Sequence, residues 1–267
     1  MRDDSARFSG SIPEHYDRGL GPVLFDVFAH LMAERTAAMA PSNVLETAAG
    51  TGIVTRKLRD RLPASTRLVA TDLSSAMLDH ARAKFSPEEN VVFQAEDATR
   101  LSLSDDAFDA VVCQFGIMFF PDREAGYREA FRVLAPEGRY LFSVWDAIDF
   151  NPHGRIASEM LVETFNIDPP PFLRVGYGCA AIDPIKASLH AAGFGSIRAD
   201  VVRKDAPVVD SRAFAFGMVK GNPLAEQIAS RGVDPETLVD AVEERMKREF
   251  GAAGVPLQAI VFEARKG

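Results

Sequence analysis

Apolar and polar positions follow two different spacings along most of the chain. Short apolar runs bounded by turn residues are typical of strands. They predict seven strands, at 44–45, 67–71, 91–93, 107–115, 139–145, 196–203 and 258–265. Between the first five strands, apolar positions recur at helical spacing, as in the predicted helices 53–61 and 122–134. Strands that alternate with helices predict βαβ units, so we expect an α/β fold with a doubly wound, mostly parallel seven-stranded sheet.

The residues before this alternating region predict a helix of their own. Gly21-Pro22 precedes apolar positions at helical spacing. Because proline suits the first turn of a helix, we expect the helix to begin there. Residues 1–42 are therefore predicted to form an N-terminal helical cap.

The pattern weakens after Trp145. Prolines and glycines interrupt residues 146–180, and two helices are predicted later, at 211–229 and 235–250. Long excursions of this kind usually cover a site rather than hold a sheet together. We expect one domain over 43–267, with helical lid insertions at about 146–180 and 211–250.

Each of the first three predicted strands ends on or near a carboxylate. Glu46, Asp72 and Asp97 stand about one βα unit apart in the sequence. Because parallel strands bring their carboxyl ends to one edge of the sheet, where ligands of such folds bind, we expect the three acids to converge. A single acid at a strand end equally often caps the next helix, but three in register favour a ligand site.

The turn after the first strand, Glu46-Thr-Ala-Ala-Gly-Thr-Gly52, is rich in small residues. Gly50 and Gly52 allow a tight turn and close approach of a ligand to the backbone. A dinucleotide fingerprint, G-x-G-x-x-G, would need glycine where the chain has Ala48 and Ile53. A carboxylate at Glu46 would also repel a pyrophosphate, and no GKS or GKT triplet follows. Nicotinamide and phosphate-loop enzymes are therefore disfavoured.

A ligand with hydrogen-bond donors and a positive charge fits these positions better. An acid such as Asp72, at the end of the second strand, is placed to accept from ribose hydroxyls. Asp97 with Ala98 is placed to meet an adenine edge, and Glu46 suits an ammonium group. An adenosine with a cationic amino-acid tail satisfies all three acids, which predicts S-adenosylmethionine as the cofactor.

The chain resembles the class I S-adenosylmethionine-dependent methyltransferases, and among them the small-molecule enzymes similar to the ubiquinone/menaquinone-biosynthesis methyltransferases. The resemblance rests on five segments within about 44–145, namely Val44–Gly52, Ala70–Met77, Gln94–Ala98, Phe108–Gly116 and Arg132–Gly138. It implies the Rossmann-like methyltransferase fold. It also implies cofactor-binding positions for Leu73, an apolar neighbour of adenine, and for Met77 and Tyr16.

Two positions depart from the family. Pro136-Glu-Gly138 replaces the more usual Pro-Gly-Gly, which affects only a turn. Ala48 stands where these enzymes usually have glycine. If the backbone there needs a positive φ, alanine costs on the order of 1 kcal/mol.

Methyl transfer from a sulfonium asks mainly for alignment of the reacting atoms, so few catalytic side chains are expected. Gln114, at the end of the fourth strand, is a candidate for contact with the methionine moiety or the acceptor, although a strand-end amide can equally bond to backbone. A general base is required only if the acceptor loses a proton, and His153 is the best-placed histidine for that role. A lone histidine is more often structural, so no catalytic residue is assigned beyond these two candidates.

Composition and charge limit the kinds of ligand and partner that we expect. The 267 residues carry a formal net charge of −8 and two cysteines. An acidic chain is a poor ligand for a phosphate backbone, so we expect no nucleic acid. The apolar run 115–120 suggests a pocket for a flat molecule, although core packing can explain at least half of it. With the resemblance to small-molecule enzymes, it leads us to expect a small, apolar or aromatic acceptor. No cluster has metal-ligand spacing and no run is long enough to span a membrane, so we expect no metal and a cytoplasmic location. The alternatives are a nicotinamide-dependent oxidoreductase and a non-catalytic S-adenosylmethionine-binding protein.

Overall fold

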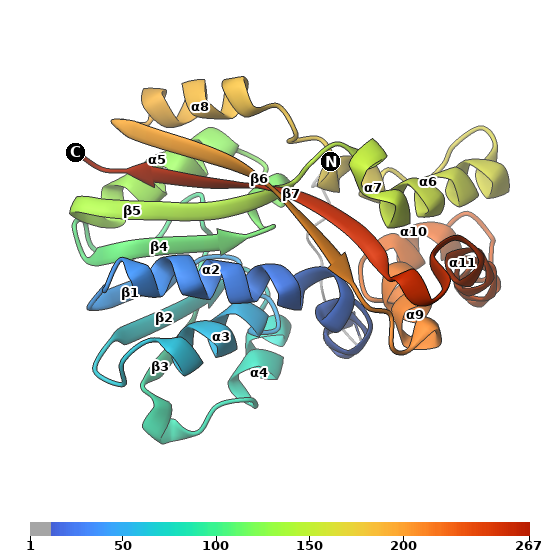
Figure 1. Ribbon diagram of the computed structural model, residues 1–267, viewed down its shortest axis with the longest axis horizontal. Coiled ribbons are helices and arrows are strands. Elements are labelled where there is room, and N and C mark those ends of the chain that lie inside the picture. Colours follow the sequence, from blue (N-terminus) through green and yellow to red (C-terminus); the bar gives the residue numbers. More distant parts are fainter. Residues whose placement is uncertain (1–11) are drawn as a thin grey trace.

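A single mixed sheet organises the computed structural model, which describes residues 12–267 (Figure 1). Its strand order is β3-β2-β1-β4-β5-β7-β6. The strands are β1 (Asn43–Glu46), β2 (Arg67–Asp72), β3 (Val91–Ala95), β4 (Phe108–Gln114), β5 (Leu134–Trp145), β6 (Ser196–Ala206) and β7 (Val255–Arg265). Strands β1 to β5 pair in parallel, whereas β7 is antiparallel to both β5 and β6. The predicted doubly wound, mostly parallel seven-stranded fold is confirmed.

Helices cover both faces of the sheet, because alternate strand residues point to opposite faces. Val44 and Leu68 pack with α2 (Asp26–Ala38) and α3 (Ile53–Arg61) in one buried cluster. Their neighbours Leu45 and Val69 belong to a second cluster, which includes α5 (Arg123–Val133) and α8 (Ile182–Ala191). Strand β1 lies between β2 and β4, so the chain changes direction across the sheet at this point. This is where ligands of open α/β sheets bind.

A second group of helices gathers beyond the sheet, on the right of Figure 1. It contains α6 (Pro152–Phe165), α7 (Phe172–Gly176), α9 (Ser211–Lys220), α10 (Leu224–Ala229) and α11 (Pro235–Phe250). Arg212 on α9 pairs with Glu236 on α11, and Arg245 on α11 pairs with Glu159 on α6. These helices come from the two predicted lid segments, and ion pairs tie them to one another.

Two short α-helices, one π-helix and four single 3₁₀ turns complete the secondary structure of residues 12–267. The remaining elements are α1 (Ile12–His15), the π-helix η2 (Tyr16–Phe25), α4 (Ser75–Arg82) and the 3₁₀ turns η3 (Pro87–Glu89), η4 (Ile117–Phe119), η5 (Ile148–Phe150) and η6 (Gly251–Ala253). Ser74 caps α4 by accepting from the Met77 N–H at 3.3 Å, and Asp122 caps α5 by accepting from the Ala125 N–H at 2.9 Å. Within residues 12–267, no helix is both long and apolar enough to cross a membrane.

The N-terminal helix does not begin at Gly21-Pro22 as predicted. The chain is already helical from Ile12, and Pro22 lies inside the π-helix η2. A proline ring clashes with the carbonyl four residues earlier in a regular α-helix, and the wider π turn relieves that clash. Residues 1–11 of the predicted cap lie outside the part that the structure describes, and the division into a cap and a domain stays a prediction.

Two other predicted boundaries were wrong. The helix predicted over 211–229 is two helices, because Pro223 cannot continue α9 and Asn222 turns the chain. The Asn222 side chain donates to the Met218 carbonyl at 3.0 Å and accepts from the Leu224 N–H at 2.9 Å. Strand β5 begins at Leu134 rather than at 139, with a register shift against β4.

Candidate functional site

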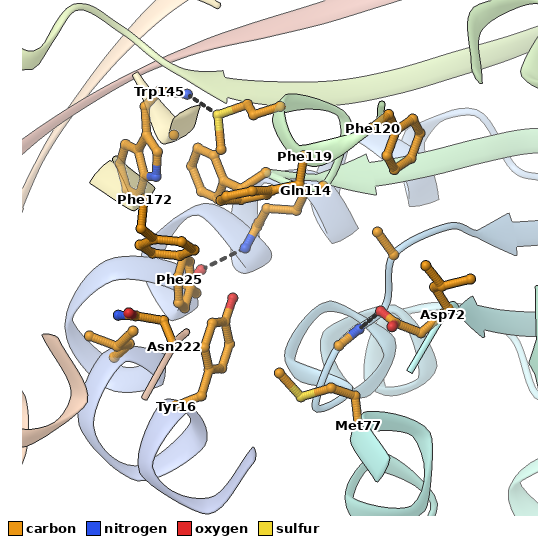
Figure 2. A pocket seen from close by; sticks show the side chains of 18 of the residues that line it. Tyr16, Phe25, Asp72, Met77, Gln114, Phe119, Phe120, Trp145, Phe172 and Asn222 are labelled. Atoms are coloured by element: carbon orange, nitrogen blue, oxygen red, sulfur yellow. Dashed lines mark hydrogen bonds between the residues drawn. The ribbon is translucent and has the colours of Figure 1, made fainter. Parts of the chain in front are cut away.

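A deep cavity lies where β1, β2 and β4 end, next to the second group of helices. Its walls come from the loop after β1, the end of β2, residues 96–99, residues 114–121 and the helical segments on both sides. Figure 2 shows one side of this cavity with Asp72 and Met77 and the opposite side with aromatic rings. A smaller pocket adjoins it and shares Tyr16, Ala48, Gly50 and Gln114.

The three predicted acids lie at this site but differ in burial and in hydrogen bonding. Asp72 lines the cavity and accepts from the Gly50 N–H and the Ser74 N–H, each at 2.8 Å. Glu46 lines the smaller pocket, where it is 2% exposed. Asp97 also lines the cavity but is exposed, and its carboxylate accepts from the backbone and hydroxyl of Thr99.

The Glu46 carboxylate is buried without a positively charged partner in the described part of the chain. Its Oε2 atom has no hydrogen-bond partner among residues 12–267. Burial raises the pKa of Glu46 to about 8; hydrogen bonding with Thr55 opposes the rise and the nearby charge of Asp72 reinforces it. Burial also raises the pKa of Asp72, although the N–H groups of Ser74 and Gly50 oppose the rise. A buried carboxylate without a counter-charge is unfavourable, so a cationic group beside Glu46 would be strongly favoured.

The loop after β1 has the left-handed backbone that its sequence suggested. Ala48, Gly50 and Gly52 have φ values of 53°, 55° and 80°. Gly50 faces open space, because a Cβ placed on it would meet no atom within 4 Å. Backbone at this position is therefore accessible to a ligand. Gly52 lines neither of the two pockets and instead precedes α3 as its N-cap.

The alanine at position 48 carries the backbone strain anticipated for a non-glycine residue. A positive φ for a residue with a Cβ costs roughly 1–2 kcal/mol. A Cβ on Gly116 would lie 2.3 Å from the Ala48 Cβ, so the loops after β1 and β4 are in close contact. Packing between the two loops thus stabilises the strained backbone conformation of Ala48.

The residues assigned to the adenosine end lie together. Leu73, Met77 and Ala98 all line the cavity near Asp72 and Asp97. Leu73 is 65% exposed although it is apolar, whereas Met77 is buried. An apolar surface beside two carboxylates suits a flat ring with exocyclic donors above a ribose.

The π-helix closes the cavity from the N-terminal side. Tyr16 lines both pockets and stacks on Phe25, with ring centroids 4.9 Å apart. Burial, and then the negative charge of Asp72, raises the pKa of Tyr16 well above its ordinary value. Asp17 accepts from the Thr51 hydroxyl at 2.8 Å and pairs with Lys84, and these contacts join the π-helix to the loop after β1 and to the segment that follows α4.

Gln114 bonds to backbone, which is one of its two predicted alternatives. Its Nε2 atom donates to the Phe25 carbonyl at 3.2 Å, as Figure 2 shows. Its Oε1 atom is buried and has no hydrogen-bond partner in the described chain, although the side chain lines the cavity. The amide therefore anchors the π-helix and leaves one acceptor for a ligand.

The other half of the cavity is aromatic. Phe119 and Phe172 stack with centroids 5.7 Å apart, and Trp145 stacks on Phe115 at 4.0 Å. The apolar run 115–120 suggested part of this wall, but sequence reasoning missed Trp145, Phe172, Tyr177 and Asn222. No local signal identifies them, because they come from segments distant in sequence that only tertiary packing brings to the cavity.

His153 is a buried residue of the cavity wall and not a surface residue. It is 1% exposed, and its Nε2 atom lies 3.0 Å from the Tyr177 hydroxyl. Burial lowers the pKa of His153 to about 3. No group of three His, Cys, Asp or Glu side chains in residues 12–267 is arranged to hold a metal ion.

The sequence and the fold are similar to those of known proteins. A family model described as a methyltransferase domain matches residues 44–138. A demethylmenaquinone methyltransferase from Thermus thermophilus is 32% identical over 179 residues, which cover 61% of this chain and 78% of that protein. One from Deinococcus radiodurans is 40% identical over 108 residues, which cover 40% of this chain and less than half (44%) of that protein.

A solved structure shares the fold. The YcgJ protein from Bacillus subtilis matches with a TM-score of 0.58 and 20% identity, over 89% of this chain and 97% of that one. These similarities leave the nicotinamide alternative without support. Since the chain covers more than two thirds of a relative that is 32% identical to it, the chain belongs to the class I S-adenosylmethionine-dependent methyltransferases.

Proposed function

We propose that this chain transfers the methyl group of S-adenosylmethionine to a small, apolar or aromatic acceptor. The observation that carries the proposal is one cavity with a carboxylate-lined end and an aromatic end. The first end suits an adenosyl cation, and the second suits a flat apolar molecule. A demethylmenaquinone-type ring is the first acceptor to test, because two relatives carry that name.

The residues of the carboxylate-lined end fit the cofactor by their chemistry. The orphaned Oε2 of Glu46 calls for a cation and would take the ammonium group. Asp72 keeps lone pairs beyond its bonds to Gly50 and Ser74, so it can accept from ribose hydroxyls. Asp97 and Ala98 would meet the adenine edge, and Leu73 and Met77 would lie against the ring.

The backbone at Ala48 and Gly50, with Tyr16 and Gln114, would surround the methionine part of the cofactor. When bound, S-adenosylmethionine supplies an electrophilic methyl group on a sulfonium. The chain's own task is to hold an acceptor in line with that methyl group and to exclude water, and such alignment is worth roughly 7–11 kcal/mol. The proposed lid segments, 146–180 and 211–250, would supply much of the acceptor wall.

Cofactor binding tests the first half of this proposal. Asp72→Ala removes the acceptor of two loop N–H groups and of the ribose, and charge-assisted hydrogen bonds are each worth about 1.5–3 kcal/mol. We therefore expect at least about a tenfold loss of affinity for S-adenosylhomocysteine by calorimetry. Asp122→Ala, which removes only the cap of α5, is the matched control and should bind normally. Wild-type protein that binds neither cofactor form would contradict the proposal.

Measurement of turnover tests the second half of the proposal, which is methyl transfer to an acceptor. Transfer of a labelled methyl group across a panel of quinols, phenols and apolar amines should give product with at least one aromatic acceptor. Cofactor binding without product for any acceptor would favour the non-catalytic alternative. The cytoplasmic location stays a prediction from the sequence.

A further inference from the structure

One polar pair interrupts the aromatic end of the cavity. His153 and Tyr177 both line it, and they are joined by the hydrogen bond between Nε2 and the phenolic oxygen. Trp145 packs against both, with ring centroids 5.7 Å from His153 and 6.5 Å from Tyr177. The other ring nitrogen of His153, Nδ1, is buried and has no hydrogen-bond partner in the described chain. The pair therefore leaves one unsatisfied polar atom beside the aromatic rings of the wall.

The two possible proton arrangements of the pair differ in how many groups they leave unsatisfied. If the Tyr177 hydroxyl donates to Nε2, then Nδ1 carries the ring proton, and Nδ1–H is the only donor without an acceptor. If Nε2–H donates to Tyr177 instead, both the Tyr177 hydrogen and the Nδ1 lone pair lack partners. Each buried unsatisfied group costs about 1–3 kcal/mol. The first arrangement is favoured, so His153 presents an N–H donor.

The surroundings keep this imidazole neutral. His153 is the second residue of α6, where the positive end of the helix dipole opposes a positive charge. Burial acts in the same direction, as its lowered pKa shows. The positive charge of a sulfonium in the same cavity would be a third effect that opposes protonation of His153. A neutral imidazole that resists protonation is a poor general base but a good hydrogen-bond donor.

Gly154 supports this geometry. A Cβ on that residue would lie 2.2 Å from the Tyr177 hydroxyl oxygen, so the missing side chain is what lets the phenol reach the histidine.

We propose that His153, fixed by Tyr177 as the tautomer with a proton on Nδ1, donates a hydrogen bond to an oxygen of the methyl acceptor and positions it, and does not act as a base. This inference rests on the proposed function and deepens it. The acceptor is then a flat apolar molecule that carries a carbonyl, hydroxyl or phenolate oxygen. An acceptor of the same shape without that oxygen would leave Nδ1–H buried and unpaired, which disfavours it.

Two probes of nearly the same size, one with an oxygen and one without, test whether the site prefers an oxygen-bearing molecule. 1-Tetralone has one carbonyl oxygen on a bicyclic frame, and tetralin has the same frame without it. Each is titrated by calorimetry into protein saturated with S-adenosylhomocysteine. We expect wild-type protein to bind 1-tetralone about tenfold more tightly than tetralin, as one recovered hydrogen bond predicts.

Variants of His153 and Tyr177 test whether these two residues cause the preference for 1-tetralone. His153→Phe should reduce the ratio of the two affinities to about one while tetralin still binds, which a misfolded protein could not show. His153→Asn keeps an N–H donor near the Nδ1 position and should retain most of the preference. Tyr177→Phe frees the tautomer and should give an intermediate ratio. His30→Asn, on the exposed side of α2, is the control and should match the wild type.

The possible failures are distinguishable. If wild-type protein does not bind S-adenosylhomocysteine, the proposed function fails. If the cofactor binds but 1-tetralone does not, or the two probes bind equally, or His153→Phe keeps the preference, the role assigned to His153 is wrong.

Discussion

Glu46 gives the most direct test of the electrostatics of the cofactor site. Its pKa is about 8 in the folded protein against an ordinary value of 4.5. At 1.36 kcal/mol per pH unit, this rise corresponds to a loss of about 5 kcal/mol of stability between pH 4.5 and 8. The sign follows from proton binding: the folded state holds this proton more tightly than the unfolded state, so raising the pH favours unfolding until Glu46 ionises in both.

Glu46→Gln removes the titration and keeps the size of the side chain. Without cofactor, the variant should gain about 3.5 kcal/mol of stability relative to wild type as pH rises from 5 to 8, and the difference should level off above pH 8. Urea unfolding at each pH measures it. Glu34→Gln, on an exposed position of α2, should show no such trend. Parallel unfolding curves for Glu46→Gln and wild type across this range would refute the reasoning.

The same residue couples protons to the cofactor. An ammonium group beside Glu46 favours its ionised form, so cofactor binding below pH 8 should release close to one proton. Calorimetry of S-adenosylhomocysteine binding in buffers of different ionisation enthalpy measures this release, which should disappear in Glu46→Gln. Affinity in wild type should rise with pH up to about 8 and remain flatter in the variant. Equal proton release from both proteins would show that the ammonium group does not lie beside Glu46.

Three further outcomes follow from the geometry. Ala48→Gly relieves the positive φ and should stabilise the protein by about 1 kcal/mol, raising Tm by about 2–4 °C in scanning calorimetry; a lower Tm would contradict the strain. Asp17→Asn should loosen the π-helix and weaken cofactor affinity. Although burial raises the pKa of Asp17, hydrogen bonds from Lys84 and Thr51 hold it below its ordinary value of 3.8, so the stability difference from wild type should vanish as pH falls below that value. Phe172→Ala should weaken acceptor binding and leave S-adenosylhomocysteine affinity unchanged in calorimetry; a joint loss would place Phe172 in the cofactor half.

The carboxylate-lined end of the cavity, where we propose that the cofactor binds, could be predicted because its residues are local in sequence. Asp72 ends a strand and Gly50 follows another, and parallel pairing brings such positions to the same edge of the sheet without further information. The sequence left open whether the backbone at Ala48 needs a positive φ, and the structure shows that it has one. Boundaries were less predictable where a rare backbone intervened, as with Pro22 inside a π-helix.

Sequence by itself predicted the sheet, the edge of it where the cavity lies and the carboxylates that line that edge, because hydrophobic periodicity and strand-end positions act over a few residues. Only the tertiary structure decided the acceptor half. Phe25, Phe119, Trp145, Phe172 and Tyr177 come from separate elements and share one wall because helices distant in sequence pack beyond the sheet. His153 changed most, from a lone histidine to a buried neutral donor, since burial and the Tyr177 hydroxyl are properties of packing that no spacing along the chain records.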